Sequence, residues 1–122
     1  MPGRVNGKLK PPPASPNCCT SVCDPNDATH YIEPLRFAGE PSAAKARLKQ
    51  ILDALPRTRC VSEDDTYLHY TFTTPVLRFT DDVEFLFDDE GVIHVRSCSR
   101  VGYSDLGANR RRIEHLRGRW DD

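Results

Sequence analysis

The chain has 122 residues, of which 38% are hydrophobic and 29% are charged, and its formal net charge at pH 7 is −1. This length fits one domain that buries roughly two-thirds of the surface of its unfolded chain. The sequence has no run of about 18 apolar residues, so we predict no transmembrane segment. A net charge near zero also argues against nucleic-acid binding. Residues 1–8 lack the apolar stretch of a signal peptide, so we expect a cytoplasmic protein if the printed N-terminus is native.

Charge is distributed unevenly along the chain. Residues 63–90 contain nine acidic residues and one arginine, a net charge of −8. Residues 96–119 contain seven arginines and two acidic residues, a net charge of +5. Because opposite charges pair, we expect the two blocks to face each other. The alternative is that the arginine-rich block meets an anionic partner.

The five cysteines are Cys18, Cys19, Cys23, Cys60 and Cys98. A disulfide framework usually has an even number of cysteines, so we expect the reduced thiols of a cytosolic protein. The three cysteines near the N-terminus lack the C-x-x-C spacing of a zinc site. We therefore predict no bound metal and no cofactor.

The first two predicted elements are an N-terminal arm and a helix. Residues 1–34 are rich in proline, which fixes φ and removes an N–H donor, so we predict an extended arm there. Residues 42–55 predict a helix that Ser42 caps and that ends at Pro56. Its apolar stripe has helical spacing and consists of Ala44, Leu48, Ile51, Leu52 and Leu55.

Four strands and a second helix follow. Alternating apolar and polar side chains predict strands over residues 57–62, 67–73, 83–87 and 92–99. A helix over residues 106–117 is predicted to be capped by Ser104 or Asp105. Its core stripe would be Leu106, Ile113, Leu116 and Trp120. This order predicts an α+β domain over residues 35–122, with an antiparallel sheet of about four strands and both helices on one face.

Residues 95–110 concentrate polar groups where the last predicted strand runs into the second helix. A helix N-terminus offers free N–H groups and a partial positive charge, and arginine forks bind carboxylates and phosphates. We therefore predict that a small anion or a protein partner binds at this turn. The residues predicted to take part are Arg96, Ser97, Ser99, Arg100, Tyr103, Ser104, Asp105, Asn109 and Arg110.

Three classes of function remain open. The leading hypothesis is a non-enzymatic binding or assembly module without catalytic residues. The alternative is a small hydrolase or metal-assisted enzyme that uses His69, His94 and Glu84, which requires these strands to bring the side chains together. The third class is a purely structural role, in which internal carboxylates fill the arginine forks, namely Asp81, Asp82 or Glu84.

Several segments of the chain resemble a family of proteins of unknown function, domain-of-unknown-function family fourteen-ninety-nine. The matching pieces are residues 7–9, 15–18, 32–35, 55–57, 67–69, 79–85 and 95–114. The resemblance implies an α+β domain and no established activity, and its relatives include exported and plastid-targeted proteins. Two departures argue against an inherited cysteine site. Cys98 stands where the family usually has a small residue, and residues 19–23 replace a run rich in serine and glutamine.

Overall fold

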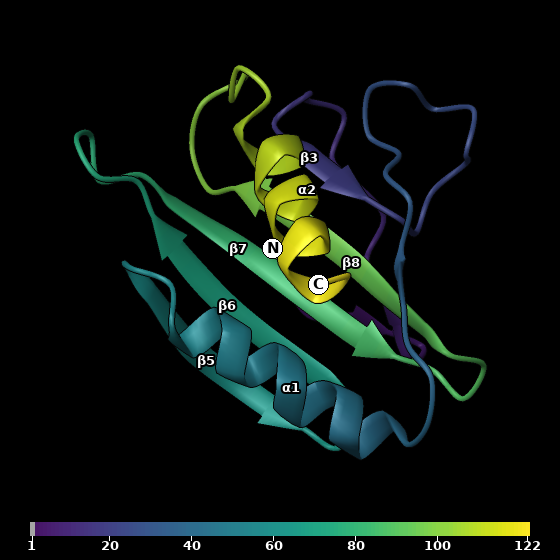
Figure 1. Cartoon of the computed structure of the whole chain (residues 1–122). Coiled ribbons are helices and arrows are strands. Elements are labelled where there is room, and N and C mark those ends of the chain that lie inside the picture. Colours follow the sequence, from purple (N-terminus) through teal and green to yellow (C-terminus); the bar gives the residue numbers. More distant parts are fainter. Residues whose placement is uncertain (1) are drawn as a thin grey trace.

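The computed structural model describes residues 2–122, in which an antiparallel sheet carries two helices on one face (Figure 1). The helices are α1 (Pro41–Asp53) and α2 (Ala108–Trp120). The long strands are β5 (Thr58–Asp64), β6 (Tyr67–Thr73), β7 (Thr80–Phe87) and β8 (Val92–Ser99). The short strands are β1 (Arg4–Val5), β2 (Lys8–Leu9), β3 (Cys18–Thr20) and β4 (Leu35–Arg36). The predicted α+β class and the four long strands are confirmed.

The main sheet has six strands rather than the predicted four or so. Its order is β3-β8-β7-β6-β5, and β4 also pairs with β8. Both β3 and β4 run antiparallel to β8, next to different parts of it. Each is only three or two residues long, too short to produce the alternation from which strands are predicted. Residues 18–20 were expected to be part of an extended arm, and instead they form the edge of the sheet.

The core lies between the sheet and the two helices. Leu68, Phe85 and Val95 are directly opposite one another on β6, β7 and β8, and all three are fully buried. Against this face α1 packs Leu48 and Leu52. Helix α2 adds the predicted residues Ile113, Leu116 and Trp120.

Two expected helix features are wrong. Leu106 is 84% exposed, because α2 begins two residues later than predicted, after Gly107 with a φ of 82°. Helix α1 begins at Pro41 after Glu40, so Ser42 lies inside the first turn and is not the N-cap. Neither helix in residues 2–122 combines the length and the apolar composition needed to cross a membrane.

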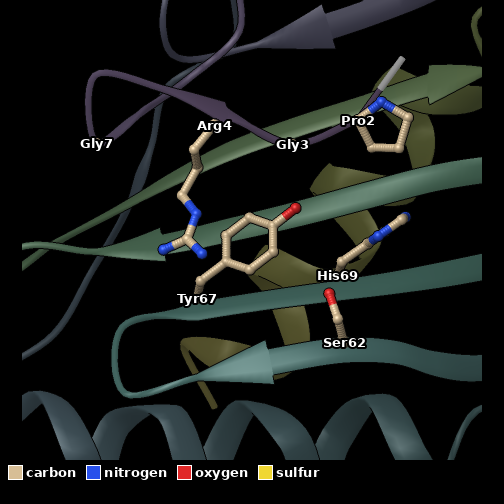
Figure 2. A pocket seen from close by; sticks show the side chains of 7 residues that line it. All are labelled: Pro2, Gly3, Arg4, Gly7, Ser62, Tyr67 and His69. Atoms are coloured by element: carbon tan, nitrogen blue, oxygen red, sulfur yellow. The ribbon is translucent and has the colours of Figure 1, made fainter.

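The second face of the sheet is partly covered by the N-terminal segment. Strands β1 and β2 form a separate two-stranded hairpin. This hairpin is tied to the sheet by the Gly3 N–H, which donates to the Glu84 carboxylate, and by Leu9, which is buried. Figure 2 shows the hairpin on the side of the sheet to which the Tyr67 and His69 side chains of β6 project.

A disulfide joins the edge strand β3 to β8. Cys18 and Cys98 are direct partners in the β3–β8 pairing and form this bond. The expectation of reduced thiols is therefore wrong for this pair, because antiparallel pairing places the two side chains face to face. Cys19, Cys23 and Cys60 are free. Burial raises the pKa of the Cys19 thiol to about 12, an effect that the charges of Arg110 and Arg112 only partly offset.

Candidate functional site

Strand β8 divides the predicted binding segment between the two faces of the sheet. Successive side chains of a strand point to opposite faces. Arg96 therefore lies on the second face, opposite Glu84, whereas Ser97 lies on the helix-covered face, opposite Val83. The nine residues predicted as one site consequently divide between the two faces, although Arg96, Ser99 and Arg100 line one hollow of about 590 Å³.

On the helix-covered face, Asn109 joins several of these residues in a closed network. Its side chain is completely buried. The Asn109 Oδ1 accepts from Ser97 Oγ at 2.7 Å, and its Nδ2 donates to Ser99 Oγ at 2.9 Å and to Asp105 at 2.7 Å. The same Nδ2 also donates to the carbonyl of Asn17 at 3.1 Å. This network ties β8, α2 and the N-terminal segment together.

The N-terminus of α2 is predicted to bind an external anion, and in the structure the Asp105 carboxylate accepts hydrogen bonds there. The Asp105 carboxylate accepts the backbone N–H groups of Gly107 at 2.8 Å and of Asn109 at 2.9 Å. Burial alone would raise the pKa of this carboxyl. The hydrogen bonds from Asn109 and Gly107 outweigh burial and hold the pKa below its ordinary value. An internal carboxylate thus accepts two of the N–H groups at this end of the helix.

On the second face, Arg96 is paired inside the protein. Arg96 is 4% exposed, and its guanidinium lies 3.4 Å from the fully buried Glu84 carboxylate. Its other terminal nitrogen donates to the carbonyl of Pro11 at 3.2 Å. Glu84 also accepts from the Tyr67 hydroxyl at 2.5 Å and from the Gly3 N–H at 2.9 Å. We call Tyr67, Glu84 and Arg96 the buried cluster.

One row further along the same face, Arg100 pairs with Asp82 in a two-pronged geometry. Two guanidinium nitrogens of Arg100 lie 2.9 Å from the two Asp82 oxygens, and His69 Nε2 lies 2.8 Å from one of these oxygens. Burial alone would raise the pKa of Asp82, but the hydrogen bonds from Arg100 and His69 hold it below its ordinary value. The Arg100 side chain is nevertheless 51% exposed, in contrast to Arg96.

The two histidines of the alternative hypothesis are not brought together, although His69 is the direct pairing partner of Glu84. His69 and His94 lie on β6 and β8, which β7 separates, and His94 is paired with Asp88 at 3.4 Å. Glu84 is saturated by three donors. Within residues 2–122, no group of three or more His, Cys, Asp or Glu side chains is arranged to hold a metal ion.

His69 does line an open hollow of about 500 Å³ under the β1–β2 hairpin (Figure 2). Ser62 lies beside His69 on the neighbouring strand, as its direct pairing partner. Tyr67 also lines this hollow, and the Arg4 guanidinium lies 4.2 Å from the centre of its ring. Burial and the bond to Glu84 raise the pKa of the Tyr67 hydroxyl, which therefore stays protonated.

A second open hollow, of about 550 Å³, lies at the end of the sheet where Arg100 leaves β8. We call it the arginine hollow. No acidic side chain lines it. Its lining consists of four arginines, four threonines and one valine: Arg57, Arg59, Arg78, Arg100, Thr58, Thr71, Thr73, Thr80 and Val61.

The charges of this hollow are largely unpaired. In the described part of the chain, Arg59 and Arg78 form no ion pair with a carboxylate, and Arg57 donates only to the carbonyl of Thr73. Arg57 and Arg78 have φ values of 58° and 59°, in the left-handed region that non-glycine residues adopt at a cost. Long cationic side chains therefore occupy two backbone positions where glycine would be less strained.

Of the remaining predicted residues, three lie near the outer end of β8 and α2. Tyr103 is 73% exposed, and the Ser104 hydroxyl accepts only the nearby N–H of Leu106. The Arg110 guanidinium reaches the carbonyl of Thr29 at 3.4 Å. Ser104 and Arg110 line one small hollow, to which Arg96 does not contribute.

Sequence reasoning missed three arginines of the hollow because they come from separate segments. Arg57 precedes β5, Arg59 lies within it, and Arg78 lies in the β6–β7 loop. They form no charge run that would attract attention. The sequence signal that could have placed Arg59 is the alternation of side chains between the two faces of a strand. Arg59 pairs with Thr71, and Thr71 pairs with Asp82, so these three residues share one face of the sheet. That signal becomes useful only when the strand order is known.

The fold and these clusters define a small α+β domain with an antiparallel sheet, two helices on one face and charged side chains on the other. A family model described as "Protein of unknown function (DUF1499)" matches residues 8–119, nearly the whole chain. The chain belongs to this family, and the resemblance seen in the sequence is confirmed. No curated protein and no solved structure gives a significant match.

Proposed function

We propose that the protein is a non-enzymatic binding module that takes an anionic ligand in the arginine hollow. The observation that carries this proposal is the composition of the hollow, with four arginines and no carboxylate in its lining. Of the residues predicted at the strand-to-helix turn, Arg100 is the one that contributes to it.

The chemistry of the lining suits an oxyanion. Guanidinium groups present forked N–H donors that match the oxygens of a phosphate or carboxylate. Threonine hydroxyls can add donors of their own. Asp82 already holds two nitrogens of Arg100, which fixes the orientation of this arginine at the border of the hollow. Arg59 and Arg78 then supply the charge that has no internal partner.

The test is thermal stabilisation by phosphate and sulfate, compared with chloride at equal ionic strength. A ligand that binds only the folded state stabilises it, by about 1.4 kcal/mol at ten times its Kd. We expect phosphate to raise the Tm of the wild type and to leave the Tm of Arg59→Gln/Arg78→Gln unchanged. A matched control is Arg36→Gln/Arg119→Gln, which removes two exposed arginines outside the hollow and should respond like the wild type.

Two outcomes would contradict the proposal. One is a wild type that phosphate and sulfate stabilise no more than chloride does. The other is an equal response in the wild type and in Arg59→Gln/Arg78→Gln, which would place the anion elsewhere on the protein.

The enzyme alternative has one observation in its favour, the hollow in which His69 lies beside Ser62 (Figure 2). His69 is hydrogen-bonded to Asp82, as a base in a hydrolase would be to an orienting carboxylate. The other two residues of the enzyme alternative do not line this hollow. His94 pairs with Asp88, and Glu84 already accepts hydrogen bonds from three donors. Hydrolysis of an activated ester that is lost in both Ser62→Ala and His69→Ala would favour this alternative over the binding module.

A further inference from the structure

Large apolar side chains are exposed on two loops next to the arginine hollow. Residues 74–79 connect β6 to β7, and residues 100–107 connect β8 to α2. We call these segments the apolar loops. Their exposed fractions are 85%, 69% and 47% for Val76, Leu77 and Phe79, and 58%, 73% and 84% for Val101, Tyr103 and Leu106. Scattered exposed apolar residues are ordinary, but a concentration of them marks an interaction surface.

Both apolar loops leave the same end of the sheet. Thr73 and Thr80, at the base of the first loop, are direct partners, and the Arg100 N–H donates to the carbonyl of Thr80. The bases of the two loops are therefore in contact. In Figure 1 the β6–β7 turn and the β8–α2 connection extend from the upper left part of the molecule, away from the β7–β8 hairpin.

The cationic groups of the arginine hollow lie at the same end of the sheet as the apolar loops. Arg57 and Arg59 come from the start of β5, and Arg100 stands at the base of the second loop. Arg78 lies within the first loop, between Leu77 and Phe79. Three of the four arginines of the hollow therefore stand at the end of the sheet, and the exposed apolar residues lie on the loops that leave it.

We propose that this end of the molecule docks on the surface of an anionic lipid bilayer. The apolar loops would enter the boundary between head groups and acyl chains, and the arginine hollow would receive lipid phosphates. This inference rests on the proposed function, and it identifies the anion as a head group instead of a free ion. Arg78 would extend its charged end back to the phosphate level, as long basic side chains do at membrane interfaces.

The order of the groups favours a bilayer over an acidic protein. From water inward, a bilayer presents first a layer of phosphates and then apolar chains. The molecule matches this order in part, because Arg57, Arg59 and Arg100 stand at the end of the sheet and the exposed apolar residues lie on the loops that leave it. Tyr103, which is amphipathic, is also a residue type enriched at membrane interfaces. Anionic head groups attract each nearby basic residue, so that several arginines act together.

The test is co-sedimentation of the full chain with phosphatidylcholine vesicles that contain or lack phosphatidylglycerol. We expect the wild type to bind only the anionic vesicles. Removal of two arginines in Arg59→Gln/Arg78→Gln should weaken binding roughly thirtyfold. Leu77→Ser/Leu106→Ser should weaken vesicle binding at least about tenfold, because each leucine loses its transfer to an apolar environment. Both leucines are exposed, so this variant should keep the Tm of the wild type.

Matched controls are Val5→Ser, which removes an exposed apolar side chain from the β1–β2 hairpin, and Arg36→Gln/Arg119→Gln. Both should sediment like the wild type. The leucine variant should also keep the stabilisation by phosphate that the proposed function predicts. Loss of vesicle binding with retained phosphate stabilisation would support docking through the apolar loops.

Four outcomes would overturn the inference. If phosphate stabilises the wild type but anionic vesicles do not bind, the docking inference fails and the proposed function stands. Vesicle binding that Leu77→Ser/Leu106→Ser retains would exclude insertion of the loops. Binding to poly-L-glutamate without binding to vesicles would replace the bilayer by an acidic protein partner. If neither phosphate nor vesicles bind, both proposals fail.

Discussion

Arg96, on β8, and Arg100, directly after its end, lie four residues apart and pair with carboxylates on the same face of the sheet, yet they belong to two different regions. The buried cluster holds Arg96 against Glu84 in the middle of the sheet, beneath the N-terminal hairpin. The arginine hollow holds Arg100 at the end of the sheet, where half of its side chain is exposed. The two regions contain the same type of cation and differ in the carboxylates that surround it.

The difference follows from the register of the strands. Glu84 is the direct partner of both His69 and Arg96, so the central row brings its own carboxylate to Arg96. Asp82 supplies the next row and is shared by His69 and Arg100. Beyond that row the lining changes to threonines and arginines. Arg96 and Arg100 both have an internal carboxylate partner, whereas Arg59 and Arg78, beyond these rows, have none among the described residues and are available to an external anion.

The largest expected effect distinguishes the two regions by stability. Arg96→Met removes one partner of a buried ion pair and leaves the Glu84 charge without compensation. Such a loss costs about 3–5 kcal/mol. The matched change in the arginine hollow is Arg59→Met, which should alter the free energy of unfolding by less than about 0.5 kcal/mol. Urea denaturation of both variants measures the difference in the free energy of unfolding. Equal destabilisation would contradict the claim that Arg96 belongs to the fold and Arg59 to an open site.

A smaller effect on stability is expected from Asp82, which borders the hollow and is hydrogen-bonded to His69 and Arg100. Its pKa is lowered in the folded protein, so its contribution to stability is complete above the pKa of the unfolded chain and is lost as the pH falls through the folded value. The free energy of unfolding of Asp82→Asn should therefore approach that of the wild type as the pH falls below about 4. Denaturation curves between about pH 6 and about pH 3 measure this convergence. A constant gap over that range would contradict the pairing of Asp82 with Arg100 and His69.

The smallest effect on stability is expected at Arg78. Its φ of 59° is one that glycine adopts without strain. Relief of this strain should offset the added flexibility of the unfolded chain, so Arg78→Gly should change stability by less than about 0.5 kcal/mol. The same change should abolish most of the stabilisation by phosphate. Differential scanning calorimetry with and without phosphate tests both statements, with Arg78→Ala as the control that keeps the strained backbone. A large loss of stability would show that Arg78 belongs to the fold instead of the hollow.

The regular part of the fold was predictable because its elements are long enough to show a period. The alternation in residues 67–73 and 92–99 and the stripe from Ala44 to Leu52 correctly placed two strands and a helix. Strands β3 and β4 have no such pattern, since pairing with β8 decides their conformation. Leu106 was assigned to the core by helical spacing, but the left-handed Gly107 starts the helix after it.

The candidate site was harder to predict because its parts meet only through the strand order. Period two does separate Arg96 from Ser97, so the division of the segment between two faces was accessible from the sequence. The closure of the α2 N-terminus by Asp105 depends on the conformation of the loop. The arginine hollow joins residues from β5, β6, β7 and the loops after β6 and β8, and no local pattern connects these segments.

The most direct test of the account is a titration of the protein with inorganic phosphate, followed by NMR signals of the arginine Nε–H groups. We predict that the signals of Arg59 and Arg78, which have no carboxylate partner among the described residues, shift together with one dissociation constant. The chemical shift of Arg96 should not change, because its guanidinium is buried and paired with Glu84. A shift of Arg96 without the others, or no shift in the arginine hollow at saturating phosphate, would contradict the claim that the hollow is the open anion site.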